Sequence, residues 1–156
     1  MIAEDYVSFE TAMLLKERGF DGYCDLCFNF IEIPRRIVNV PSDGKVSYED
    51  GILKEEIVLI PTLQMAMKWV QEVHNIVIIP NYEYECDSTP WCYKIFKLGE
   101  NGKPERVAVK GVSYDKDNNP TEHVVGYRDY ERSYKDYSTK EEAIEEGIKY
   151  CLENLI

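Results

Sequence analysis

Hydrophobic positions recur with a helical period in three stretches of the 156-residue chain. In each stretch, apolar residues three and four positions apart follow a Ser or Thr that can cap a helix. The predicted helices lie near residues 9–18, 62–74 and 139–156. Ser138 and Glu141 match a capping box at the start of the third helix, and Gly19 and Asn75 suit the left-handed backbone that ends the first two.

Between these helices, apolar and polar residues alternate, which is typical of half-buried strands. The predicted strands lie near residues 23–30, 54–60, 76–80, 91–98, 105–111 and 123–129. Asn101-Gly102 and the segment from Asp117 to Pro120 each predict a hairpin. The expected architecture is a single α+β domain over residues 1–156, with about three helices packed on one face of a mainly antiparallel sheet, in two layers.

Composition narrows the class of protein. With 44% hydrophobic residues the chain can build one core, and 18 basic against 29 acidic side chains give a net charge of −11. This charge disfavours general binding to nucleic acids or to anionic membranes, and leaves an acidic mimic of nucleic acid as an alternative. An acidic start and the lack of any long apolar run predict a cytoplasmic protein with no membrane span.

The five cysteines are an odd number, which favours a reducing compartment over a disulfide framework. Cys24 and Cys27 have the spacing of a zinc or redox pair, and Cys86 and Cys92 would complete four thiolates. Within a strand, however, residues three apart face opposite sides, and the pair follows a helix instead of preceding one. We therefore expect core cysteines and no cofactor, with zinc bound by these four residues as the alternative.

No catalytic signature stands out. The chain has only two histidines, no phosphate-binding loop, and too many carboxylates for any pair to be distinctive. A small enzyme that depends on cysteine or zinc remains an alternative. The sequence otherwise favours a non-enzymatic protein.

The segment from Gly126 to Tyr137 is the most unusual part of the sequence because aromatic and charged residues alternate along it. Aromatic faces beside cations can stack a base, hold a phosphate, or anchor a protein partner. The candidate binding residues are Tyr127, Arg128, Tyr130, Arg132 and Tyr134. The alternative is structural: the rings cover an edge of the core while their hydroxyls reach water.

Three stretches carry a resemblance: residues 7–20, 61–76 and 143–156. They resemble a family of small uncharacterised proteins encoded by bacteriophages and prophages of gut anaerobic bacteria. The resemblance implies an accessory protein of a virus or mobile element, made in the cytoplasm of a bacterial host, and it implies no catalytic residue.

These observations together predict a non-enzymatic binding module. Its expected partner is a host or viral protein, or a small nucleotide-like ligand that it sequesters. The two alternatives are the cysteine- or zinc-dependent protein and the acidic nucleic-acid mimic.

Overall fold

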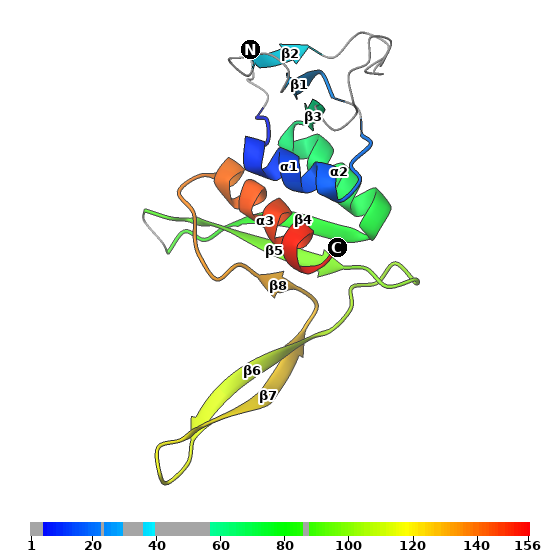
Figure 1. Cartoon of the computed structure of the whole chain (residues 1–156). Helices are drawn as coiled ribbons and strands as arrows, with labels where there is room; N and C mark the ends of the chain where they lie inside the picture. Colours follow the sequence, from blue (N-terminus) through cyan, green and yellow to red (C-terminus); the bar gives the residue numbers. More distant parts are fainter. Residues whose placement is uncertain (1–4, 23, 30–35, 40–56, 86–87) are drawn as a thin grey trace.

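The computed structural model describes residues 5–22, 24–29, 36–39, 57–85 and 88–156, and it confirms an α+β fold (Figure 1). The helices are α1 (Phe9–Glu17), α2 (Leu63–His74) and α3 (Lys140–Asn154). The strands are β1 (Leu26–Asn29), β2 (Arg36–Asn39), β3 (Ile57–Ile60), β4 (Ile76–Tyr82), β5 (Trp91–Lys97), β6 (Val107–Tyr114), β7 (Pro120–Arg128) and β8 (Glu131–Arg132).

The strands are antiparallel, as predicted, but they are divided among three small sheets. Their orders are β2-β1-β3, β4-β5-β8 and β6-β7. The helices α2 and α3 pack against the second sheet, while α1 contacts α3 and β3. Figure 1 shows the helices between the first two sheets, and the β6-β7 sheet extending away from them.

Side-chain caps begin the three helices. Ser8 and Thr62 accept hydrogen bonds from the third residues that follow them, as the sequence suggested. The third cap differs from the prediction: Thr139 accepts the hydrogen bond of the Glu142 N–H at 3.2 Å. Ser138 instead donates its hydroxyl to the Glu142 carboxylate at 3.0 Å. Because two adjacent residues could both cap, the sequence pattern identified the helix but misplaced its start by one residue.

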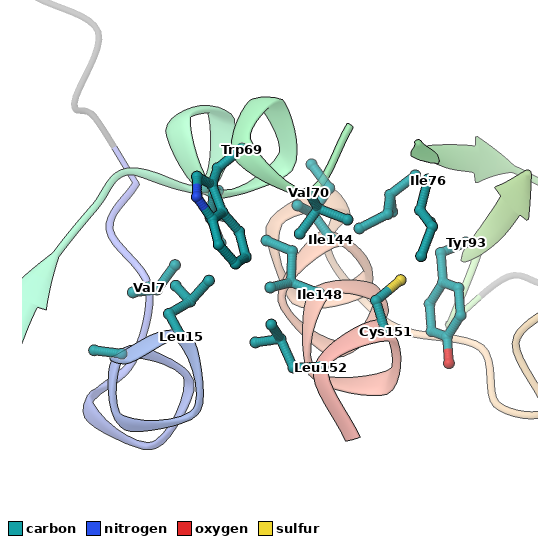
Figure 2. Packing of buried hydrophobic residues seen from close by; sticks show 14 of the residues in the cluster. Val7, Leu15, Trp69, Val70, Ile76, Tyr93, Ile144, Ile148, Cys151 and Leu152 are labelled. Atoms are coloured by element: carbon teal, nitrogen blue, oxygen red, sulfur yellow. The ribbon is translucent and has the colours of Figure 1, made fainter. Parts of the chain in front are cut away.

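The core lies between α1, α2 and α3, the β4-β5-β8 sheet and β3, which contributes Val58 and Ile60. Figure 2 shows Ile148 and Leu152 of α3 between side chains of α1 and α2 on one side and strand side chains on the other. Both residues are fully buried, as are Leu15 of α1, Val70 of α2 and Ile95 of β5. Burying these aliphatic side chains is the main stabilising term of such a domain.

A polar contact joins α1 to α3 at the edge of this core. Glu145 of α3 accepts hydrogen bonds from the Ser8 N–H at 2.9 Å and from the hydroxyls of Ser8 and Thr11. One turn further along α3, Lys149 donates to Glu10 at 2.9 Å. The first and third helices are therefore held together by polar as well as apolar contacts.

The two predicted hairpins have different outcomes. At Asn101-Gly102 the chain does turn tightly, with Gly102 at a φ of 71° and the Gly99 N–H bonded to the Lys103 carbonyl at 2.9 Å. The strands on either side do not pair, however, because β5 pairs with β4 and β8 while β6 pairs with β7. Pro104, which lacks an N–H, pairs with Leu98 in an isolated bridge, and the chain then leaves β5 and continues into the β6-β7 sheet.

The second predicted hairpin is confirmed. It joins β6 to β7 through a turn in which Asn118 adopts a left-handed φ of 61°. The Asp115 carboxylate accepts hydrogen bonds from the N–H groups of Asp117 and Asn119, at 2.9 and 2.8 Å. Both features are typical of tight polar turns.

At the first sheet, the strand expected over residues 23–30 begins only at Leu26, and β2 was not predicted. Among the described helices, none is long and apolar enough to cross a membrane.

Candidate functional site

The β6-β7 hairpin, here called the arm (residues 107–128), forms a sheet of its own. It extends from the β8 edge of the β4-β5-β8 sheet, away from the helices (Figure 1). A register shift between Val109 and Lys110 marks a bulge in the pairing. Bulges increase the local twist of a strand, and an isolated two-stranded hairpin is only marginally stable in water. Contact with another molecule would therefore stabilise the arm.

One face of the arm is apolar along most of its length. Strand alternation and the cross-strand register place these residues together, and they are called the apolar face: Ala108, Val112, Tyr114, Val124 and Tyr127. The last four side chains are exposed by 58%, 65%, 50% and 61%. Lys110 and Glu122 lie on the same face and form an ion pair of 3.1 Å near its middle. A contiguous exposed apolar surface of this kind is typical of an interaction site.

A cleft of about 620 Å³ lies between the arm and the rest of the molecule. Its walls are strand residues of the arm on one side and β5, β8 and α3 on the other. The lining residues are Tyr93, Val107, Ala108, Val109, Lys110, Val112, Glu122, Arg128, Glu131, Arg132, Ser133, Tyr134 and Tyr150. Three of the five predicted binding residues, Arg128, Arg132 and Tyr134, are therefore brought together at one cleft.

The tyrosines of the predicted segment do not form one surface. Tyr127 lies on the apolar face of the arm, with the Arg106 guanidinium 5.4 Å from its ring centre. Tyr130 packs beside Phe96, with ring centres 5.6 Å apart, and does not line the cleft. Tyr134 is fully exposed. The segment folds as a strand end, a turn and the short β8, so its tyrosines lie on different surfaces.

Arg132 is held by two carboxylates. It donates to Glu83 at 2.8 and 3.3 Å and to Asp136 at 2.7 Å. The hydrogen bonds that Arg132 donates to Glu83 are the main reason that the pKa of Glu83 lies below its ordinary value. Two carboxylates more than balance the single guanidinium charge, so Arg132 is poorly placed to bind a phosphate.

Arg128 is the other cation of the predicted segment at the cleft. Its Nε is buried with no hydrogen-bond partner among the described residues, and its guanidinium lies 5.3 Å from the centre of the Tyr130 ring. Glu131, which also lines the cleft, accepts a hydrogen bond from the Tyr150 hydroxyl at 2.8 Å, which raises the pKa of Tyr150 to about 12. The cleft therefore presents mixed charges instead of a positive cradle.

The structure separates the cysteines of the alternative zinc site. Cys24 lies just before β1 and Cys27 within it, whereas Cys92 is in β5, in a different sheet; Cys86 lies outside the described residues. β1 begins after Cys24, so the two cysteines do not lie on one strand, as the prediction assumed; both are buried. Burial raises the pKa of Cys24 to about 12 and also raises the pKa of Cys27.

Within the described chain, the only group of three possible metal ligands is Glu83, Cys92 and Asp136. Both carboxylates of this group bind Arg132, and the Cys92 thiol is fully buried at 3.6 Å from Glu83. A cation would have to displace the guanidinium. This cluster is thus built as an ion-pair network, which the sequence did not reveal because Glu83 and Arg132 are far apart along the chain.

The apolar face of the arm and the cleft adjoin each other, because Ala108, Lys110, Val112 and Glu122 of that face also line the cleft. No family model, curated protein or solved structure matches the chain.

Proposed function

We propose that this protein is a non-enzymatic interaction module that binds a protein partner through the apolar face of the arm. One observation carries the proposal: four large apolar side chains, each at least half exposed, share one face of a hairpin that extends away from the core. In a monomer this arrangement leaves apolar area in water, and covering it on binding is favourable.

Two features of the arm suit it to a protein surface. Tyr114 and Tyr127 provide rigid aromatic area with a polar hydroxyl, which is typical of residues that dominate protein interfaces. Its two strands form a separate sheet, so that each also offers an unpaired edge among the described residues.

A small nucleotide-like ligand in the cleft is less well supported. Arg132, which would bind its phosphate, is already paired with Glu83 and Asp136. The lining also contains Glu122 and Glu131, whose charges oppose an anion. An enzyme built on the described cysteines is disfavoured for a similar reason, since burial raises the pKa of each of these thiols and suppresses the reactive thiolate.

The setting of this interaction follows from the resemblance to phage and prophage proteins. On that basis the expected environment is a bacterial cytoplasm, and the expected partner is a host or viral protein. The nucleic-acid mimic has no particular structural observation in its favour.

The test is site-specific crosslinking in a bacterial host. A photoreactive residue at position 114 or 127 of the arm should give a discrete protein adduct, and the same residue at position 71, exposed on α2, should not. The adduct is identified by mass spectrometry, and its binding is then measured with both proteins purified. Equal crosslinking from the arm and from α2, or purified binding that a Val112→Lys variant leaves unchanged, would refute the proposal.

A further inference from the structure

We infer that the occupant of the arm is a second copy of this chain, with the apolar faces of two arms packed against each other about a two-fold axis. The inference rests on the proposed function, in that it names the partner of the same surface. It places two two-stranded sheets face to face, so that each covers the apolar side chains of the other.

The charges on the apolar face are self-complementary. Lys110 and Glu122 sit together near the middle of this face, 3.1 Å apart, with apolar residues along the strands on both sides. A two-fold axis through this point brings Lys110 of one copy toward Glu122 of the other, and the reverse. Two ion pairs then form between the copies, each between Lys110 of one and Glu122 of the other. A partner surface that carried only positive or only negative charge would repel either Lys110 or Glu122.

The charge of the whole chain also favours this choice of partner. The chain carries −11, but the arm is neutral, with three basic residues (Lys110, Lys116, Arg128) and three acidic ones (Asp115, Asp117, Glu122). A strongly basic partner would be attracted to the acidic remainder of the molecule and not to the arm. A second copy, repelled elsewhere, can approach at the arm.

The length of the arm keeps the two acidic bodies apart. Eight residues of β6 extend roughly 27 Å along the strand, which is well beyond the screening length of about 8 Å at physiological salt. Two arms that pack in opposite directions therefore place their bases, where each arm joins the rest of its own molecule, at opposite ends of the packed strands.

The experiment measures mass by light scattering and sedimentation over a wide range of concentrations. The wild-type chain is expected to shift to twice its monomer mass as the concentration rises. Lys110→Glu and Glu122→Lys each place two like charges on the face, and each is expected to weaken self-association by about tenfold or more. An equimolar mixture of the two variants is expected to recover the dimer, because one face is then doubly acidic and the other doubly basic.

Matched controls use a similar ion pair far from the arm. Lys68 and Glu72 on α2 are 3.7 Å apart, with side chains exposed by 65% and 64%, compared with 63% and 58% for Lys110 and Glu122. Lys68→Glu and Glu72→Lys should leave the self-association of the wild type unchanged. Circular dichroism checks that every variant is folded. If a charge variant fails to fold, Val124→Thr, which keeps the side-chain shape, should weaken the dimer by about threefold to tenfold.

Three results would overturn the inference. These are a wild-type chain that stays monomeric at every concentration, a mixture of the two charge variants that stays monomeric, and a dimer that the Lys68 or Glu72 control disrupts as strongly as the arm variants do. If the wild-type chain stays monomeric but the arm crosslinks to another protein, the dimer is refuted while the proposed function stands. The failure of the dimer and the failure of the proposed function are therefore distinguishable.

Discussion

Arg132 and Glu83 lie 49 positions apart in the sequence and are joined by two hydrogen bonds of 2.8 and 3.3 Å. Glu83 directly follows β4 and Arg132 ends β8, so the contact spans the sheet across β5. Asp136 completes the network at 2.7 Å from the same guanidinium. The segment singled out for binding is thus held to the sheet by one of its own candidate residues.

Removing this guanidinium should destabilise the fold. Arg132→Ala is expected to lower the free energy of unfolding by about 1–2 kcal/mol, because it leaves two partly buried carboxylates without their partner. Arg106→Ala, at an exposed position, should change it by less than about 0.5 kcal/mol. Denaturation in urea measures both. An unchanged stability for Arg132→Ala would instead favour a role in ligand binding.

Acid should weaken the same network. The Arg132 guanidinium holds the pKa of Glu83 below its ordinary value, so the unfolded chain binds a proton at Glu83 more readily than the folded protein does. The stabilisation is complete above the ordinary carboxyl pKa, near about 4.3, and is lost as the pH falls through the lower folded value. Unfolding measured between about pH 5 and pH 3 should therefore depend more steeply on pH for the wild type than for Glu83→Gln. Identical slopes would show that the ion pair contributes nothing.

Gly147 should not tolerate a methyl group. In a helix, alanine is normally favoured over glycine by about 0.5–1 kcal/mol. Here a Cβ would lie 2.9 Å from Ile78 Cγ2 and 3.2 Å from Tyr93 Cγ, where α3 rests on β4 and β5. We expect Gly147→Ala to lower the melting temperature, with a cost of about 1–3 kcal/mol. Gly126→Ala, with no atom within 4 Å of the new Cβ, is the control. A more stable Gly147→Ala variant would mean that this packing is looser than described.

The described cysteines should react slowly with a thiol reagent. Cys24, Cys27, Cys92 and Cys151 are buried, and burial raises the pKa of Cys24 and of Cys151 to about 12. In a Cys86→Ser background, the native protein at neutral pH should therefore release little colour from Ellman's reagent, and denaturant should release the full amount. In the wild-type chain, which keeps all four cysteines of the zinc alternative, rapid reaction after addition of a chelator alone would revive that alternative.

The helices were predictable because their signals are local. A capping Thr62, a helical period and a left-handed Asn75 are all read within one stretch of sequence. The arm was predictable for the same reason, since its turn joins neighbouring strands. The division into three sheets was not predictable. The turn at Asn101-Gly102 forms as its local sequence indicates, but β5 pairs with β4 and β6 pairs with β7, and the sequence of the turn does not determine these partners.

The candidate site was predicted in part. Alternation of Tyr and Arg identified a segment of which Arg128, Arg132 and Tyr134 line the cleft, but alternation along the chain does not show which side chains reach the same surface. The partners that decide what Arg132 can do, Glu83 above all, come from another strand. The apolar face of the arm was overlooked because apolar residues occur on both faces of its strands, as at Val107, Ala108 and Val109, and the sequence does not show which face the rest of the fold leaves exposed.

The contact between α1 and α3 sets an order for folding during synthesis. Glu145, which accepts hydrogen bonds from Ser8 and Thr11, follows Ser8 by 137 positions, and the arm is synthesised between them. The helical core therefore cannot close until α3 has emerged, whereas the two strands of the arm pair with each other and can form as soon as Arg128 has emerged. A nascent chain would thus expose its apolar arm before it has a core, and would depend on chaperones or on rapid completion to avoid premature association.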